Sequence, residues 1–186
     1  QGILGINIMT ATNNYAEQVR VCVEEKANLI ISGAGLPTNL PGMVKDSATK
    51  IAPIVSSAKG AKVITKLWTK KYDYLPDLMV VEGPKAGGHL GFSPEVLSKP
   101  VLPDLKTIVS EVIEILKPFE KAYGKRIPVI AAGGIYTGKD IAEFIKLGAA
   151  GVQMATRFVA TDECDAHINF KKAYINAQDD TIKIVV

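Results

Sequence analysis

A glycine-rich loop that contains one histidine is the stretch of this sequence best equipped for chemistry. Residues 78–81 are apolar without alternation, and they lead into residues 83–91, which read GPKAGGHLG. A run that is apolar on both faces is typical of a parallel strand covered by helices. Glycines after such a strand leave the backbone open to a ligand, and a histidine can transfer protons near neutral pH. The loop is therefore a candidate catalytic site with His89 as its proton-transfer group, although a glycine-rich turn with a solvated histidine has the same pattern.

Two later stretches have the composition of a phosphate-binding site. Gly133 and Gly134 follow the apolar segment 127–131, and residues 151–158 (GVQMATRF) follow the next expected helix. Adjacent glycines leave backbone N–H groups uncovered, and Thr156 offers a hydroxyl donor. Arg157 could add charge, but a surface or packing role is the favoured interpretation. No Gly-x-Gly-x-x-Gly motif opens a helix after a strand, which argues against a Rossmann nucleotide site.

Apolar strands alternate with amphipathic helices along the whole chain. The expected strands are residues 3–8, 29–32, 51–55, 78–81, 127–131 and 151–154. This alternation predicts a parallel sheet with helical crossovers, either doubly wound or closed into a barrel. Polar or glycine residues follow nearly every strand, and a (β/α)8 TIM-type barrel gathers all such strand ends onto one face. We therefore predict a single barrel domain over residues 1–186, incomplete at both ends, with its first one or two βα units expected upstream of Gln1.

Several residues have predicted structural roles. Trp68 lies at helical spacing with other apolar residues and is expected in the core, whereas Pro53 is awkward inside a strand. Glu82 ends the same strand as the histidine loop and is interpreted as a structural carboxylate, while Lys85 is expected to be solvated. Residues 94–103 are expected to be irregular. Helix caps are expected at Asn13 or Asn14, at Asp104 and at Thr137.

Composition and charge indicate an ordinary globular protein of one domain. The 186 residues are 47% hydrophobic and 22% charged, with a net charge of +3. Neither a basic cluster with interleaved aromatics nor an apolar run near the roughly 20 residues of a membrane span is visible. We therefore expect no nucleic-acid or membrane partner, and a cytoplasmic location. Homo-oligomerisation is left open.

The cysteines and histidines do not predict a metal site. Cys22 lies in an apolar helical pattern and is expected to be a small core residue. Cys164 and His167 form a Cys-x-x-His pair, but zinc needs further ligands and the sequence offers no second cluster. We expect no metal, and reduced thiols.

Five segments of the chain, taken in order, resemble the nitronate monooxygenases, formerly called 2-nitropropane dioxygenases. The resemblance covers essentially the whole chain and extends to the related flavin-dependent enoyl-acyl-carrier-protein reductases. It implies an FMN-dependent (β/α)8 barrel whose first two strands precede the first of these segments. The segments are GINIM at residues 5–9, SGAGLP at 32–37, AGGHLG at 86–91, AAGGI at 131–135 and GVQMATRF at 151–158.

The resemblance also implies roles for individual residues. Asn7 matches the family's flavin-contacting asparagine, Gly87 and Gly88 match glycines that pass close to the flavin, and His89 matches the active-site histidine. The remaining implied FMN contacts belong to the phosphate loop. They are Gly133, Gly134, Gln153, Met154, Ala155 and Thr156, with Ala155 standing where the family usually has glycine or another small residue.

The chemistry that the resemblance implies is oxidation of an alkyl nitronate or nitroalkane, with FMN as cofactor and O2 as co-substrate. His89 would take a proton from a neutral nitroalkane, or stabilise charge if the nitronate anion is the substrate. Three alternatives stay open: an FMN-dependent enoyl-acyl-carrier-protein reductase that uses NAD(P)H, an NADH:quinone reductase, and a non-catalytic flavin-binding barrel. The Ala-Gly-Gly-His loop is shared with the first alternative, so His89 does not separate the two.

Overall fold

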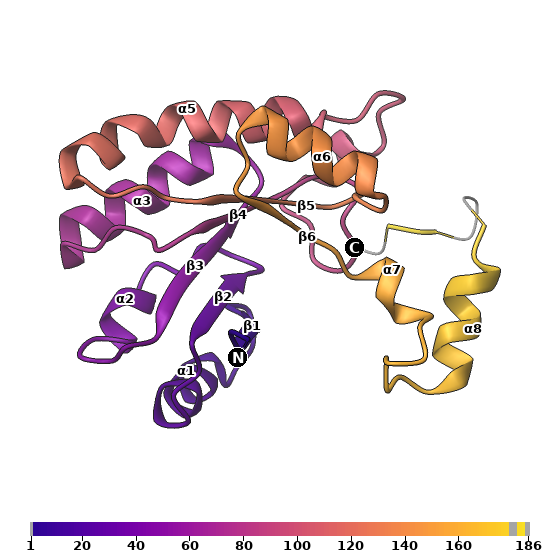
Figure 1. Cartoon of the computed structure of the whole chain (residues 1–186), viewed down its shortest axis with the longest axis horizontal. Helices are drawn as coiled ribbons and strands as arrows, with labels where there is room; N and C mark the ends of the chain where they lie inside the picture. The colour runs from indigo at the N-terminus through magenta and orange to yellow at the C-terminus, as the bar shows by residue number, and fades with distance from the viewer. Residues whose placement is uncertain (1, 179–181, 185–186) are drawn as a thin grey trace.

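The computed structural model describes residues 2–178 and 182–184, in which strands and helices alternate around one parallel sheet (Figure 1). The strands are β1 (Gly5–Met9), β2 (Leu29–Gly33), β3 (Lys50–Val55), β4 (Met79–Glu82), β5 (Val129–Ala132) and β6 (Gly151–Gln153). The helices are α1 (Tyr15–Glu24), α2 (Leu40–Met43), α3 (Ala58–Tyr72), α4 (Pro94–Leu97), α5 (Leu105–Tyr123), α6 (Gly138–Leu147), α7 (Thr156–Val159) and α8 (Ile168–Asn176). All six predicted strands are present within one or two residues of their predicted ends.

The order of the strands decides between the two predicted architectures. The six strands are neighbours in sequence order, β1 to β6, and every pair is parallel. In a doubly wound sheet the order of the strands reverses at a switch point, and the strands of the described residues show no such reversal. The sheet instead curls, with α1 to α3, α5 and α6 on its outer side (Figure 1). The described residues thus form a half-barrel with open edges at β1 and β6, in keeping with the incomplete barrel that the sequence predicted. A complete (β/α)8 ring stays a prediction.

The main core lies between the sheet and its outer helices. Alternate strand residues such as Ile8, Ile30 and Val81 lie there in one cluster with side chains from α1, α3 and α5, as the two-residue period of a strand requires. The prediction for Trp68 is confirmed, because its side chain is fully buried and its indole N–H donates to the carbonyl oxygen of Pro37 at 3.0 Å. Pro53 does lie inside β3. It is the last residue there in register with β2, and Ile54 is the first in register with β4.

The predicted caps are confirmed at two of three helices. The carboxylate of Asp104 accepts from the amide of Thr107 at 3.0 Å, and Thr137 forms a reciprocal capping box at the start of α6. Asn14 occupies the N-cap of α1 but makes no capping bond, because its side-chain oxygen accepts from Gln18 instead, at 2.8 Å. The prediction of an irregular segment 94–103 was wrong for its first residues. They form α4, which has a proline in its first turn where a missing N–H costs nothing.

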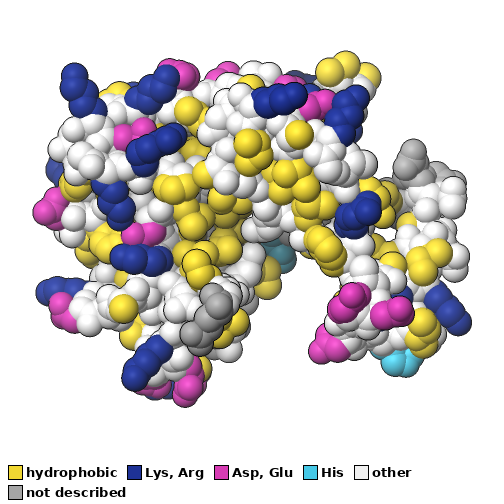
Figure 2. Space-filling model, viewed as in Figure 1, with side chains coloured by type: hydrophobic (Ala, Val, Ile, Leu, Met, Phe, Trp, Pro, Cys, Tyr) yellow, Lys and Arg dark blue, Asp and Glu magenta, His cyan; other side chains and the backbone are white. Residues whose placement is uncertain are grey.

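Helix α8 lies apart from the main core. It packs against α7 beyond the end of the sheet (Figure 1), and no residue of it is buried. Figure 2 shows hydrophobic side chains over this helix and also along the middle of the same view, between α5 and α6 above and α1 and α2 below. The α8 side chains involved are Ile168, Phe170, Tyr174 and Ile175. Helix α8 therefore adds nothing to the core that holds the sheet.

A buried carboxylate joins the amino ends of β3 and β4. Asp77 accepts from the Tyr74 hydroxyl at 2.5 Å, the Ile51 amide at 3.0 Å and the Lys125 ammonium at 2.9 Å, with Lys50 at 3.6 Å. Burial acts to raise the pKa of Asp77, but the hydrogen bonds from Tyr74, Lys125 and Ile51 outweigh it, so the pKa lies below its usual value. The ionised form is thus the one that the fold stabilises.

Replacing this carboxylate should destabilise the fold in a pH-dependent way. Hydrogen bonds to a charged group contribute about 1.5–3 kcal/mol, so Asp77→Asn should lower the free energy of unfolding by about 1–3 kcal/mol at neutral pH. A pKa that is lowered on folding gives stability that is present above the unfolded value and lost as the pH falls through the folded one. Urea unfolding of both proteins should therefore differ clearly at neutral pH and converge in acid. An equal difference at both pH values would contradict this account of Asp77.

Candidate functional site

Three polar side chains face the concave side of the sheet, away from the helices. In β1, Ile6 and Ile8 pack toward the helix-side core, so Asn7 between them points to the concave side, where it is exposed. The same alternation applies to Glu82, which follows the core residue Val81, and to Gln153, whose neighbour Val152 packs on the core. Asn7 and Gln153 therefore lie on the concave face, which is the inner face in a closed barrel.

Glu82 and Gln153 lie in the same layer of the sheet. Glu82 is in register with Ala132, and Ala132 is in register with Gln153. The two side chains therefore flank a single alanine at the carboxyl ends of β4, β5 and β6, which leaves space between them. Asn7 lies on the opposite edge strand, β1, and none of the described contacts joins it to the other two.

The loops that follow β4 and β5 are in contact through the glycine pair. Gly133 and Gly134 have φ values of +98° and +76°, a region that favours glycine. A Cβ atom at Gly133 would lie 3.0 Å from the amide nitrogen of Ala86, and one at Gly134 would lie 2.9 Å from the Cβ of Lys85. The structure thus brings the predicted phosphate loop against the start of the glycine–histidine loop, and glycine is required for the approach.

Gly87 and Gly88 are exposed, with open space where a side chain would begin. A Cβ atom built at either would have no heavy atom within 4 Å, although Gly88 has a φ of +83°. His89 beside them is exposed and makes no hydrogen bond within the described residues. Farther along the loop, Gly91 returns to the sheet, where a Cβ would lie 2.3 Å from the hydroxyl of Ser56. Residues 87–89 therefore form an exposed stretch between two segments that are held against the rest of the protein.

The second half of the predicted phosphate loop follows β6. Ala155 and Thr156 are exposed, whereas the side chain of Met154 packs on the helix-side core, so only its backbone can face a ligand. Arg157 stacks on the ring of Tyr136, with its guanidinium carbon 4.9 Å from the ring centroid. Arg157 is also exposed, in agreement with the favoured interpretation of a surface or packing arginine.

The structure corrects the interpretation of Glu82 as a structural carboxylate. The side chain is half-buried, yet it has no hydrogen bond or ion pair within the described residues. Burial raises the pKa of this carboxyl. A carboxyl placed without a partner on the concave face is typical of a ligand site. The two-residue period of a strand could have placed Glu82 on the concave face from the sequence, because Glu82 is two residues after Val80, which faces the same way.

Glu82 should make the protein less stable as the pH rises. A pKa raised on folding means that the folded state holds its proton longer, so stability falls as the pH passes from the unfolded value, about 4.3, through the folded one. In flavin-free protein, Glu82→Gln should therefore raise the thermal midpoint at about pH 8 and have little effect at about pH 4. A midpoint shift of the same size at both pH values would show that the carboxyl is not strained by burial.

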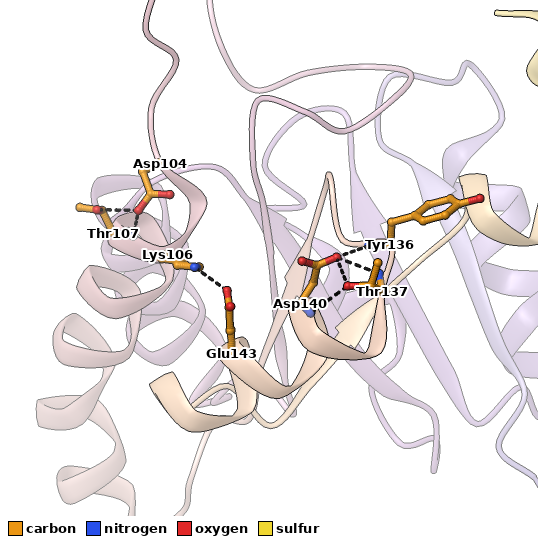
Figure 3. Close-up of polar contacts among 7 residues, drawn as sticks. All are labelled: Asp104, Lys106, Thr107, Tyr136, Thr137, Asp140 and Glu143. Carbon is orange, nitrogen blue, oxygen red and sulfur yellow. Dashed lines mark hydrogen bonds and ion pairs between the residues drawn. The ribbon is translucent and has the colours of Figure 1, made fainter.

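A cleft of about 520 Å³ is lined in part by the glycine pair, Gly133 and Gly134. Lys85, Pro103 and Phe144 contribute to its walls, and an ion pair of 2.6 Å between Lys106 and Glu143 spans α5 and α6 there (Figure 3). None of residues 153–156 lines this cleft. It therefore does not join the two halves of the predicted phosphate loop, and we do not assign the cofactor to it.

The described residues hold neither a metal cluster nor a helix that could span a membrane. They contain no group of three or more histidine, cysteine, aspartate or glutamate side chains that could hold a metal ion. No helix among them is long and apolar enough to cross a membrane. Cys22 is partly buried against the core, and burial raises the pKa of its thiol.

Fold and site together define a class of protein: a parallel βα half-barrel whose strand-end loops, rich in glycine, form an open cradle beside inward-facing polar groups. Comparison with known proteins then gives the family. Residues 2–186 match the sequence profile described as nitronate monooxygenase, and the chain belongs to that family.

Two curated relatives are oxidoreductases by name, and both are longer than this chain. An octahydro-indene-carboxyl-CoA dehydrogenase of Mycobacterium tuberculosis is 28% identical over 93% of the chain, which spans 42% of that protein. A probable nitronate monooxygenase of Staphylococcus aureus is 37% identical over 57% of the chain, which spans 28% of that protein. The chain thus covers less than half the length of either relative.

Two solved structures share the fold. FabK from Thermotoga maritima superimposes with a TM-score of 0.74 at 32% identity, covering 95% of this chain and 49% of that one. A nitroalkane oxidase from Streptomyces ansochromogenes gives a TM-score of 0.69 at 22% identity, covering 92% of this chain and 55% of that one. The half-barrel therefore corresponds to about half of each of these proteins.

Proposed function

We propose that this chain forms the FMN-binding side of an oxidoreductase that oxidises alkyl nitronates or nitroalkanes with O2. The observation that carries the proposal is the glycine backbone at Gly87, Gly88, Gly133 and Gly134, which we call the glycine cradle. The loops after β4 and β5 meet at Gly134, and residues 87–89 beside them are open to a ligand. Membership of the nitronate monooxygenase family supports the same assignment.

The residues present fit a flavin mononucleotide. Bare amides at Gly133 and Gly134, with the hydroxyl of Thr156, suit a phosphate. The open backbone at Gly87 leaves room for a flat ring, because a Cβ there would meet no protein atom. Asn7 and Gln153 offer amide groups on the concave face, and such groups can accept and donate hydrogen bonds to ring nitrogens and oxygens.

The chain's own part in the reaction is to place the substrate and to manage its proton. When bound, FMN would accept electrons from the substrate and pass them to O2. His89, exposed on the open loop, would take the proton from the carbon that bears the nitro group, which leaves the nitronate. For a substrate that is already a nitronate anion, His89 would hold its negative charge by a hydrogen bond.

A second candidate is an FMN-dependent reductase of enoyl thioesters that uses NAD(P)H. The extent of similarity favours it, because FabK is 32% identical over 95% of this chain whereas the nitronate monooxygenase of S. aureus matches only 57%. The two candidates differ in the electron donor that reduces the flavin, which is the nitronate or nitroalkane in the first and NAD(P)H in the second. This difference gives the experiment that separates them.

The test is anaerobic reduction of the flavin in the full-length protein. Ethylnitronate is added to one sample and NAD(P)H to another, and the visible spectrum is followed in both. Loss of the oxidised flavin bands with ethylnitronate alone is the result we expect. Rapid bleaching by NAD(P)H with no response to ethylnitronate would move the assignment to the thioester reductase, or to a quinone reductase if added quinone restored the bands.

A further inference from the structure

An arginine–tyrosine pair joins the two segments to which we assign the FMN phosphate. Tyr136 follows the glycine pair after β5, and Arg157 follows residues 153–156 after β6. A guanidinium N–H of Arg157 donates to the carbonyl oxygen of Tyr136 at 3.2 Å, and its carbon lies 4.9 Å from the ring centroid. The pair therefore bridges the two segments across the helix, α6, that separates them in sequence.

The backbone of Tyr136 is also held from the other side. Its amide donates to the carboxylate of Asp140 at 3.1 Å, and the amide of Thr137 donates to the same oxygen at 2.8 Å. Figure 3 shows these bonds, with the ring of Tyr136 pointing away from Asp140. The N–H of Tyr136 is thus fixed to the first turn of α6, while its carbonyl is fixed to α7.

Arg157 holds the loop after β5 at a fixed distance from the loop after β6. Its planar group is engaged by a carbonyl and an aromatic face, which is the use of arginine that lysine reproduces poorly. Helix α7 is a single turn that continues directly from Thr156. A contact that fixes Arg157 therefore also fixes the position of residues 155 and 156 relative to the glycine pair.

We propose that Tyr136 and Arg157 are positioning residues that set the separation of the two halves of the phosphate loop, and that Arg157 acts through Tyr136 rather than by touching the phosphate. This proposal rests on the proposed function, because it assumes that FMN binds between these segments. It predicts a selective effect on the phosphate. FMN and riboflavin share the ring system, and they differ in that group.

The experiment compares FMN and riboflavin affinities in the full-length protein by flavin fluorescence. Arg157→Ala should weaken FMN by about tenfold, on the scale of a cation–π contact plus a charged hydrogen bond. Tyr136→Ala keeps the backbone carbonyl that Arg157 bonds and removes only the ring contact, so it should weaken FMN by about three- to fivefold. Both variants should leave riboflavin within about twofold. The double variant should be no weaker than Arg157→Ala alone, because that variant already removes the ring contact that Tyr136→Ala removes. Tyr136→Phe should keep FMN affinity, since the hydroxyl makes no hydrogen bond within the described residues.

Arg157→Lys separates positioning from direct charge. A lysine keeps the charge but not the planar stack, so it should resemble Arg157→Ala. Full FMN affinity in Arg157→Lys, additive losses in the double variant, or an equal loss of riboflavin would each overturn the proposal. Wild-type protein that binds riboflavin as tightly as FMN would overturn it as well. Wild-type protein that binds neither flavin would overturn the proposed function itself, and the positioning role with it.

Discussion

Replacing His89 with alanine should lower turnover of a neutral nitroalkane by about 10²-fold or more, the usual scale for losing a general base. The bound flavin should be unaffected. His89 is exposed and makes no hydrogen bond within the described residues, so its removal disturbs no part of the fold. Steady-state kinetics on a nitroalkane, together with flavin content, provide the measurement.

The role of His89 can be resolved further with a second variant and a second substrate. His89→Asn keeps a hydrogen-bond donor but cannot take the proton. If proton transfer is the role, this variant should fail on the nitroalkane and recover most activity on the preformed nitronate. If the role is electrostatic, both substrates should suffer in His89→Ala, and asparagine should restore part of each.

The second histidine offers a matched control for these variants. His167 is also exposed, and its ring nitrogen accepts from the Asn169 amide at the start of α8, away from the glycine loop. His167→Ala should leave turnover and flavin content unchanged. Wild-type turnover of the nitroalkane by His89→Ala would remove His89 from the mechanism.

Replacing Gly134 with valine should weaken FMN binding by about tenfold or more, the loss expected when hydrogen bonds to a charged group are broken. Gly134 has a φ of +76°, and a Cβ there would lie 2.9 Å from the Cβ of Lys85. The loop must therefore move, and its amides move with it. Titration of the flavin-free protein with FMN measures the effect.

Backbone strain alone needs a control, and Gly124 supplies one. Its φ is +61°, and a Cβ there would meet no atom within 4 Å. It ends α5, away from the cradle. Gly124→Val should cost stability through the same strained conformation, yet leave FMN affinity unchanged. Equal loss of FMN in both variants would attribute the Gly134 effect to destabilisation rather than to the phosphate loop.

Gly87 tests the cradle without strain in the protein. A Cβ there would meet no protein atom within 4 Å, and its φ is not in the left-handed region. Gly87→Ala should therefore leave the thermal midpoint of the flavin-free protein unchanged and weaken FMN. Unchanged FMN affinity would mean that the flavin does not pass close to this residue.

The sequence predicted the elements of the fold because each strand carries a continuous apolar run and each crossover helix has a readable start or stop. Asp104 and Thr137 are local signals of this kind, and the structure confirms both. Asn14 failed as a capping side chain because Gln18, one turn later, competes for its oxygen. Closure of the barrel could not be read from residues 1–186, since the described strands end at two open edges.

Parts of the site that depend on residue types within one loop could be predicted from the sequence. Parts that depend on contacts between residues far apart in the sequence could not. The glycines at 87, 88, 133 and 134 mark loops whose backbone is open or left-handed. The bond between Arg157 and Tyr136 joins residues that are separated by α6 and β6, so no local pattern announces it. The structural role expected for Glu82 was wrong because the described residues offer its carboxyl no hydrogen-bond or ion-pair partner, which no local pattern reveals.

The most direct test of the central claim is the flavin content of the purified full-length protein. The account predicts an oxidised-flavin spectrum with about one flavin per chain, and it predicts that denaturation releases FMN rather than riboflavin or FAD, as chromatography would show. A protein that shows no flavin bands, and that gains none after incubation with FMN, would contradict the assignment of the glycine cradle as a cofactor site.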